Sequence, residues 1–317
     1  MFSKFKPFFL IAETPLHPGS GSEVGIVDLP IQRERHTNFP KIEASGLKGS
    51  IREVFCNLEK EIDIGSDKKV KIKDYVNLIF GPEKGNTHAG SLAFTDARIL
   101  FLPVKSLKNV FAWITCPQVI QRFEEDMRIA GVELKNFPKD VKSDTLPEGS
   151  NIVISSKIVL EEFTFDIKPD LETKKLSEWF AQKIFPMRET IDPYKYWRDK
   201  FQKDLVILED DEFAEFVSTS TEVIARTIIN NKTGTADNLW YEEYLPQDTI
   251  LYSIAMGTPI RILDDKEKGL FRSDSSEKEA EKVINYFKDG VPDVIQIGGN
   301  QTIGKGITRI QILEEEE

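Results

Sequence analysis

The first apolar run of the chain predicts a buried strand. Residues 5–16 are almost continuously apolar and aromatic, and Pro15 stands near the end of the run, so the segment has the pattern of a buried strand that leads into a turn. Residues 17–44 then show no sustained helical or strand period. A connection of this length is unusual in a compact domain, and such loops are usually functional or disordered.

A helical period begins at Ser45. Lys48 and Arg52 are four residues apart in it, so their cations lie on one face of the predicted helix and form a candidate phosphate clamp. Two solvated helix charges are the more frequent origin of such a spacing. The apolar residues that follow the helical period on the core face are Leu47, Ile51, Val54, Phe55, Leu58 and Ile62.

The middle of the chain predicts alternating strands and helices. Strands are expected at 92–103 and 109–116 and a helix at 119–130, which gives the order strand, helix, strand, strand, helix of a ferredoxin-like unit. Residues 131–149 are polar and rich in proline, and residues 151–167 alternate like a strand pair. Helices are then expected at 171–186 and around Trp197.

The last third predicts a return to the core. Strands are expected at 217–230 and 248–256, and a helix at 277–288. Two short strands, 294–297 and 307–313, flank a glycine-rich loop at residues 298–306.

Together these patterns predict an α+β protein with a modified ferredoxin-like (RRM-type) core, an inserted thumb and helical region, and a C-terminal glycine-rich loop. We expect a single domain over residues 1–317, with the core mainly in 1–130 and 246–317 and the insert at about 131–245. No internal repeat is present at a period of 20–50 residues, which argues against a solenoid.

The composition is that of a globular protein, with 40% apolar and 10% aromatic residues. The longest apolar runs fall short of the roughly 20 residues that cross a bilayer, and the first residues lack the features of a signal peptide. A cytoplasmic protein without a membrane partner is therefore expected. Cys56 and Cys116 have no metal-ligand spacing, and both are predicted to be small buried hydrophobic residues.

The net charge of −11 argues against a protein whose whole surface binds nucleic acid. Many acids, however, lie in the runs 209–211 and 314–317, which solvent alone can accommodate. Between residues 29 and 52 the balance reverses, and a basic strip on an acidic body suits a groove for RNA. Its members are Arg33, Arg35, Lys41, Lys48 and Arg52, against Glu34 and Glu43.

The glycine-rich loop resembles a phosphate-binding loop in spacing, with Gly299 followed by Gly304 and Lys305. Gly306 stands where a magnesium-binding Ser or Thr is expected, and too few residues follow for a nucleotidase fold. The backbone N–H groups of such a loop can still bind an RNA phosphate. The alternative is a tight turn between edge strands.

Five further segments carry a resemblance to a known family. The chain resembles the RAMP superfamily of CRISPR-associated proteins, and within it the repeated backbone subunit of the type III-B, or Cmr, complex. The matching segments are T-P-L-H-P-G-S-G at 14–21, V-D-L-P-I-Q-R-E-R at 27–35, G-L-K-G-S-I-R at 46–52, G-S-L-A-F-T-D-A-R at 90–98 and L-W-Y-E-E-Y-L-P at 239–246.

The resemblance implies a subunit that stacks with other copies of itself into a helical filament along guide crRNA, together with other subunits of the complex. A protruding thumb displaces guide bases, and complementary single-stranded target RNA is cut beside each displaced base. The family's catalytic aspartate falls on Asp28, after the first strand. The turn at residues 232–236, followed by aromatic residues, suits a hairpin tip pressed between nucleotides, although a plain surface hairpin has the same pattern.

RNA can be cut by in-line attack of its own 2′-hydroxyl, which requires alignment and charge stabilisation more than a protein nucleophile. Asp28 is the expected ligand of a divalent metal, Mg²⁺ or Mn²⁺, that binds only with RNA present. Outside the resemblance, an aspartate in a loop is more often a turn or capping residue. His17 is a candidate acid or base, although such a histidine more often only binds phosphate. The resemblance implies supporting roles at the cleavage site for Glu242 and Tyr244, although both also fit ordinary thumb-strand packing against Trp240.

A second set of residues is expected to bind the phosphates of the guide RNA. Such contacts give affinity without sequence preference. The expected RNA-binding residues are Lys48, Arg52, Gly298, Gly299, Gly304, Lys305 and Gly306.

Three alternatives remain open from the sequence. The first is a non-catalytic crRNA-binding scaffold in which Asp28 is only structural. The second is a metal-independent RAMP endonuclease that processes precursor crRNA through His17. The third is the backbone subunit of the sister type III-A complex, against which the 28–35 segment argues.

Overall fold

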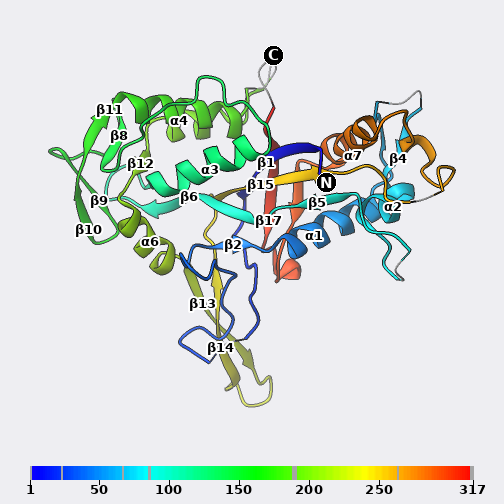
Figure 1. The fold of residues 1–317 in the computed structure, drawn as a ribbon. Coiled ribbons are helices and arrows are strands. Elements are labelled where there is room, and N and C mark those ends of the chain that lie inside the picture. Colours follow the sequence, from blue (N-terminus) through cyan, green and yellow to red (C-terminus); the bar gives the residue numbers. More distant parts are fainter. Residues whose placement is uncertain are drawn as a thin grey trace.

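One large mixed sheet organises the chain (Figure 1). The predicted α+β class is confirmed. None of the described helices is long and apolar enough to cross a membrane. This computed structural model describes residues 2–22, 24–65, 68–84, 87–187, 191–262 and 264–314.

The sheet is antiparallel except for the pairs β12–β7 and β11–β8, which are parallel. Two short strands, β2 (Lys41–Ile42) and β5 (Leu92–Phe94), pair with β6 and β15 beside the main path. In spatial order the main path is β11 (Lys168–Asp170), β8 (Thr145–Pro147), β12 (Leu205–Ile207), β7 (Phe111–Thr115), β6 (Ala97–Lys105), β15 (Ile250–Gly257), β1 (Lys4–Ala12), β17 (Ile307–Ile312) and β16 (Val294–Gln296).

Strand β1 explains why its segment is a continuous apolar run. Successive side chains of a strand point to opposite faces of the sheet. Phe8 and Leu10 therefore lie in one hydrophobic core, and Phe9 and Ile11 lie in the other. The strand is buried on both faces, as its sequence predicts.

Helices cover the two faces of the sheet separately. The first face carries α1 (Ala44–Asn57), α2 (Val76–Phe80) and α7 (Ser276–Gly290). The second face carries α3 (Pro117–Ile129), α4 (Leu171–Ile184), α5 (Lys195–Phe201) and α6 (Asp210–Thr219). Short 3₁₀ turns occur at η1 (Ile72–Tyr75), η2 (Gly269–Phe271) and η3 (Gln301–Ile303).

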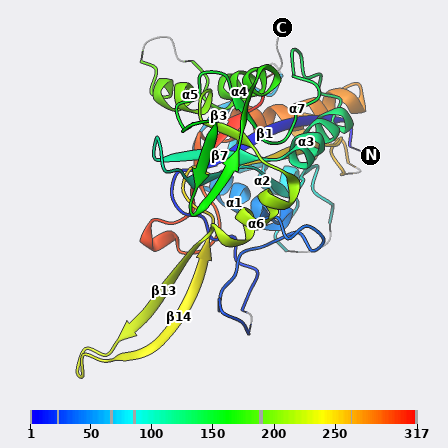
Figure 2. The same cartoon turned by 90° about the vertical axis from the view of Figure 1, so that its left-hand side faces the viewer.

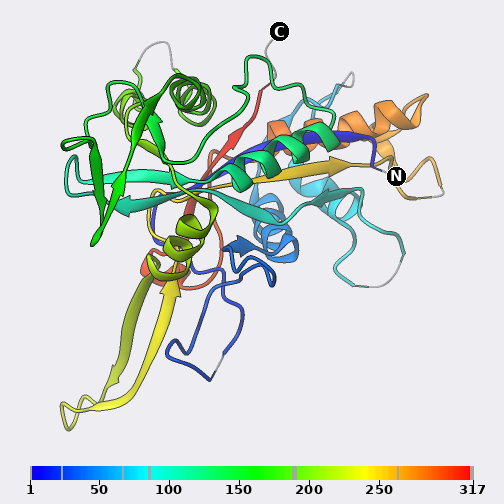
Figure 3. The same cartoon turned by 60° about the vertical axis from the view of Figure 1, so that its left-hand side comes forward.

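Three two-stranded ribbons lie outside the main sheet: β3 (Glu61–Ile62) with β4 (Val70–Lys71), β9 (Lys157–Leu160) with β10 (Phe163–Asp166), and β13 (Glu222–Ile229) with β14 (Ala236–Tyr244). Figures 2 and 3 show the β13–β14 hairpin projecting from the body of the protein. It exposes several large apolar side chains: Val223, Ile228, Ile229, Leu239 and Tyr241.

Most predicted elements are present, and the differences have local causes. The strand expected from Val217 begins only at Glu222, because residues 217–219 complete helix α6. The acidic run at its start is not merely solvated: Glu209 and Glu212 form a capping box at the α6 N-terminus.

Other expectations need correction. The strand expected at 92–103 is divided into β5 and β6, and Ile62 belongs to β3 rather than to the helix.

Cys116 is buried as predicted, but Cys56 is exposed on α1, so the prediction that Cys56 is buried was wrong. Of the acidic tail, Glu314 pairs with Lys6 and Lys288, and residues 315–317 lie outside the described residues.

The region expected to be an insert is continuous with the rest of the sheet. Strands β8, β11 and β12 all come from this region, and β12 pairs directly with β7. The sheet alone does not mark a boundary between residues 1–130 and 246–317 on one side and residues 131–245 on the other, so the division into core and insert stays a prediction.

Candidate functional site

The long loop, of which residues 13–22 and 24–40 are described, runs beside the base of the β13–β14 hairpin (Figure 1). Leu16 and Leu245 exchange two backbone hydrogen bonds of 2.9 and 2.8 Å. Farther along, Leu29 N–H donates to Tyr241 O, and Glu243 N–H donates to Leu29 O, both at 3.0 Å. The segment around Leu29 thus adds a short parallel bridge to β14 and places Asp28 at the hairpin base.

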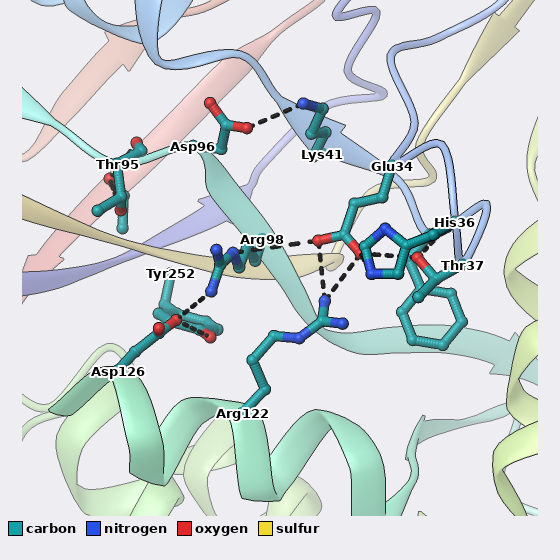
Figure 4. A network of polar contacts seen from close by, with 12 residues as sticks. Glu34, His36, Thr37, Lys41, Thr95, Asp96, Arg98, Arg122, Asp126 and Tyr252 are labelled. Atoms are coloured by element: carbon teal, nitrogen blue, oxygen red, sulfur yellow. Dashed lines mark hydrogen bonds and ion pairs between the residues drawn. The ribbon is translucent and has the colours of Figure 1, made fainter. Parts of the chain in front are cut away.

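A network of charged side chains holds the far end of this loop (Figure 4). The Glu34 carboxylate accepts from Arg122 Nη1 at 2.8 Å and from Thr37 Oγ1 at 2.6 Å, and Arg98 lies within 4.0 Å. Arg98 in turn donates to Asp126 at 2.6 Å. Burial alone would raise the pKa of Glu34, but the hydrogen bonds from Thr37 and Arg122 outweigh it and hold that pKa below its ordinary value.

The Glu243 carboxylate is the second anchor of the loop. It accepts from Ile31 N–H at 3.0 Å, from Arg33 Nη2 at 2.5 Å and from Thr221 Oγ1 at 2.8 Å. Glu243 therefore joins the loop to both strands of the hairpin base.

These contacts correct the prediction of a free basic strip. Arg33 is paired with Glu243, and Lys41 is paired with Asp96 at 2.9 Å and with Glu43 at 2.6 Å. Arg35 is exposed. The positive charge of the segment is therefore mostly used to fix the loop.

Asp28 keeps part of its carboxylate available. Its Oδ2 accepts from the backbone N–H of Tyr241 at 2.8 Å, so the hairpin itself orients the side chain. Among the described residues no hydrogen bond or ion pair reaches Oδ1. The side chain is half-buried, so one oxygen can meet a ligand that approaches the hairpin.

A group of polar side chains, the hairpin-base cluster, lies on one face of the hairpin: Arg226, Trp240, Glu242 and Tyr244, with Asn300 from the glycine-rich loop. Glu242 accepts from Trp240 Nε1 at 2.8 Å, from Asn300 Nδ2 at 2.9 Å and from the Tyr244 hydroxyl. Arg226 Nε lies 3.3 Å from the same carboxylate.

These contacts set the protonation states of the cluster. Burial raises the pKa of Glu242, but the hydrogen bonds from Tyr244 and Trp240 and the charge of Arg226 outweigh it, so that pKa is lowered. Burial, followed by the Glu242 carboxylate, raises the pKa of Tyr244. The cluster therefore holds a carboxylate beside a neutral phenol.

His17 is enclosed where the long loop, the glycine-rich loop and the hairpin meet. Its Nδ1 lies 2.6 Å from the Glu243 carbonyl oxygen, which can only accept, so Nδ1 carries the hydrogen in the neutral ring. Nε2 faces Gly19, where a Cβ atom would lie only 2.8 Å away. The ring packs against Tyr244 with 5.4 Å between centroids, and His17 is 8% exposed.

The glycine-rich loop needs glycine at two close approaches. Gly298 and Gly306 have φ of 80° and 75°, and a Cβ there would lie 2.3 Å from His17 O and 2.0 Å from Ile297 O. Gly299 N–H donates to His17 O at 3.0 Å. The loop is therefore held by backbone contacts.

Lys305 also faces the hairpin-base cluster. Its Nζ lies 5.1 Å from the centroid of the Tyr244 ring, a cation–π distance. Gly304, by contrast, has no atom within 4 Å of a built Cβ, so its backbone is open to a ligand.

Lys48 and Arg52 form a separate cationic group on α1. Arg52 is less free than its spacing suggests, because it donates to Gly81 O at 2.5 Å and to Asn77 Oδ1 at 2.7 Å. Lys48 is half-buried, and within the described part of the chain it has no hydrogen bond or ion pair. Burial lowers the pKa of Lys48, and the charges of Arg52 and Arg261 lower it further.

The structure thus groups most predicted site residues at the hairpin base. They are His17, Asp28, Glu242, Tyr244, Gly298, Gly299 and Lys305, whereas Lys48 and Arg52 lie on α1. Sequence reasoning missed Arg226, Asn300 and Arg261. Arg226 pairs with Trp240 in a hairpin whose turn spans residues 230–235, so the position of that turn was the available signal for Arg226.

Among the described residues no three His, Cys, Asp or Glu side chains converge as metal ligands do. The open Oδ1 of Asp28 suits a magnesium-type site, in which one carboxylate acts together with substrate phosphates. The carboxylate of Glu242, already surrounded by donors, does not.

Comparisons with known proteins agree with these features. A model of the RAMP superfamily matches residues 9–309. The CRISPR system Cmr endoribonuclease Cmr4 of Pyrococcus furiosus is 38% identical over 95% of this chain and 93% of the relative. The CRISPR system CMR subunit Cmr4 of Saccharolobus solfataricus is 25% identical over 98% of this chain and 97% of the relative.

A solved structure extends the agreement to three dimensions. Oligomeric Cmr4 from Pyrococcus furiosus superposes with a TM-score of 0.71 at 30% identity, over 99% of both chains. The family predicted from the sequence motifs is therefore confirmed, and the chain belongs to the RAMP superfamily.

Proposed function

We propose that this chain is a backbone subunit of a type III-B CRISPR effector complex, which binds guide crRNA along a filament of its own copies and cleaves complementary target RNA. The observation that carries the proposal is the 38% identity, over nearly the whole chain, to a Cmr endoribonuclease. Its partners are guide and target RNA, further copies of itself and other subunits of that complex. The cytoplasmic location expected from the sequence is part of the same proposal.

We infer that the sheet is an elaborated ferredoxin-like core and that the β13–β14 hairpin is its thumb. The hairpin projects from the body and exposes apolar side chains such as Ile228 and Leu239. Such side chains stack against bases without reading their sequence.

Two surfaces would hold the guide. Lys48, with Arg52 and Arg261 close by, offers a phosphate a half-buried ammonium that has no hydrogen bond or ion pair with any described residue. Lys305 and the backbone N–H groups of the glycine-rich loop offer a second contact. Because these contacts are electrostatic, binding should weaken as salt rises and should not depend on sequence.

The cleavage would proceed by in-line attack within the RNA. The bond from O2′ to phosphorus forms as the bond from phosphorus to O5′ breaks. The 2′-hydroxyl loses its proton, and the departing O5′ gains one from solvent. The products are a 2′,3′-cyclic phosphate and a 5′-hydroxyl. Asp28, fixed by Tyr241, orients the reacting RNA at the hairpin base.

A divalent ion, Mg²⁺ or Mn²⁺, would be held by Asp28 together with RNA oxygens, and only when RNA is present. When bound, such an ion supplies positive charge for the phosphate oxygens and favours loss of the hydroxyl proton. The open Oδ1 of Asp28 supports this assignment.

The enclosure of His17 argues against the alternative of metal-independent processing. Its Nδ1 is committed to Glu243 O, and its Nε2 faces Gly19. A buried ring in this position supports the geometry of the two loops better than it serves as an acid or base.

The proposal is tested with the reconstituted complex and an RNA complementary to the guide. Cleavage with Mg²⁺ or Mn²⁺, its loss with chelator, and the absence of cuts in a non-complementary RNA are expected. Cuts that persist in chelator would contradict metal dependence. A complex that binds the complementary RNA without cutting it would favour the scaffold.

A further inference from the structure

Arg226 occupies a position that the cleavage scheme above leaves unassigned. It lies on β13 directly opposite Trp240, so its side chain shares a face of the hairpin with Glu242 and Tyr244. Its Nη2 donates to the Tyr244 hydroxyl at 3.1 Å, and its Nε lies 3.3 Å from Glu242 Oε2. The guanidinium is therefore held by one hydrogen bond at Nη2 and by the ion pair of Nε with Glu242, and Nε itself makes no hydrogen bond.

The third nitrogen of Arg226 is available. Within the described part of the chain, Nη1 makes no hydrogen bond, and the side chain is 28% exposed. A guanidinium is planar, so the hydrogen bond at Nη2 and the ion pair at Nε together orient Nη1. The cluster therefore presents an oriented, charged N–H edge to whatever approaches this face of the hairpin.

Glu242 and Tyr244 have little capacity left for a ligand. The Tyr244 hydroxyl donates to Glu242 and accepts from Arg226 and from Asn300 Nδ2, the latter at 2.8 Å. The Glu242 oxygens accept from Trp240, Tyr244 and Asn300. The arrangement suits a support that orients Arg226 rather than a pair of groups that exchange protons with RNA.

We propose that Arg226 is a further catalytic residue of the RNA cleavage, with its Nη1 edge donating to a non-bridging oxygen of the scissile phosphate. This inference rests on the proposed function. In-line attack concentrates negative charge on the non-bridging oxygens as the O2′–P bond forms and the P–O5′ bond breaks, and a preorganised cation stabilises that charge. The guanidinium transfers no proton, so the balance of the step is unchanged.

The first test measures single-turnover cleavage and target affinity separately in the reconstituted complex. Arg226→Ala removes the side chain, and Arg226→Gln keeps an amide donor near Tyr244 but removes the charge. Both should slow cleavage by about 100-fold, the size expected for the loss of one transition-state donor. Target affinity should stay within about threefold, because the contact strengthens in the transition state. Arg128→Ala, exposed on α3, is the matched control and should cleave normally.

A second test asks whether Arg226 contacts the phosphate itself. Sulfur replaces each non-bridging oxygen of the scissile phosphate in turn. In the wild-type complex, one stereoisomer should be cleaved more slowly because sulfur accepts a hydrogen bond weakly. In the Arg226→Gln complex the same sulfur should cause no further slowing, because the contact is already absent. Additive effects of the sulfur and the substitution would overturn the proposal.

The outcomes separate this inference from the proposed function. A wild-type complex that fails to cut would sink the proposed function. A wild-type complex that cuts, alongside an Arg226→Gln complex that cuts within about threefold of it, would overturn only the role of Arg226. Loss of target affinity equal to the loss of rate would likewise overturn it, since the residue would then act in binding alone.

Discussion

The two loops that meet at the hairpin base are held there by different interactions. The long loop has backbone bonds to the hairpin at Leu16 and Leu29, but its later part, residues 31–38, is anchored by charged side chains, with Glu34 bound by Arg122 and Glu243 bound by Arg33. The glycine-rich loop depends on backbone contacts so close that Gly298 and Gly306 have no room for a Cβ. One loop should therefore respond to charge and pH, and the other to added volume.

The difference bears on function because each loop carries a different part of the site. The long loop carries Asp28, which would act on the target RNA. The glycine-rich loop carries Lys305 and Asn300, which face the hairpin-base cluster. Perturbing the loops independently shows how each contributes.

The largest effect is expected for Gly306→Ala. The new Cβ would lie 2.0 Å from the backbone oxygen of Ile297, which cannot rotate away, and φ is 75°. We expect a loss of about 3 kcal/mol in unfolding free energy, measured by urea denaturation.

Gly304→Ala is the matched control, since it has the same φ but no atom within 4 Å of the Cβ. It should cost about 1 kcal/mol. Equal losses for the two variants would show that the close approach of Gly306 does not matter.

Glu34→Ala tests the charged side of the comparison. The Glu34 side chain is 11% exposed and lies between Arg122 and Arg98, so its removal leaves these two cations without the carboxylate that separates them. We expect a loss of about 2 kcal/mol in unfolding free energy. This is less than the loss for a fully buried ion pair, because solvent still screens the exposed part of Glu34. Asp199→Ala, which removes a surface pair with Lys195, should cost under about 0.5 kcal/mol. A Glu34 variant as stable as this control would contradict the anchoring role.

Acid should release the long loop before the glycine-rich loop. The folded-state pKa of Glu34 is below its unfolded value, so its contribution is fully present above about pH 4.3 and is lost as pH falls through the folded-state value. Protection of Glu34 and Asn38 N–H from hydrogen exchange, relative to the intrinsic rate at each pH, should therefore fall below about pH 4, and Glu34→Gln should flatten that dependence. Exchange at Ile297 N–H, which donates to Gly306 O, would contradict the distinction if its protection fell in parallel.

A smaller effect on stability than for Gly306→Ala or Glu34→Ala is expected for Asn300→Ala. It removes the hydrogen bonds to Glu242 and Tyr244 and should cost about 1 kcal/mol in unfolding free energy. Asn300→Asp should cost more, because it places a second carboxylate beside Glu242. If the two variants were equally stable, Asn300 would not contact Glu242.

Periodicity predicted the parts of the fold that are set by local burial. The apolar run of β1 and the helical face of Leu47, Ile51 and Phe55 on α1 both follow from side-chain direction alone. The path of the long loop could not be predicted from periodicity, because it depends on ion pairs between Glu34 and two residues distant in sequence, Arg98 and Arg122.

The candidate site was predictable to a similar extent. Motifs placed Asp28, Glu242 and Tyr244, and the structure shows them at one hairpin base. Arg226 and Asn300 require the hairpin register and the position of the glycine-rich loop, which single-sequence patterns do not supply. The basic strip was overestimated because sequence spacing does not show which charges are already paired.

The most direct test of the account is target cleavage by the reconstituted complex containing Asp28→Asn or Asp28→Ala, with guide and target binding measured in parallel. The Asn variant keeps an acceptor for Tyr241 N–H and removes only the charge. We predict regularly spaced cuts in the wild type, their loss in both variants, and unchanged RNA binding. Cuts that survive in both variants would contradict it and leave this subunit a scaffold at the site of cleavage.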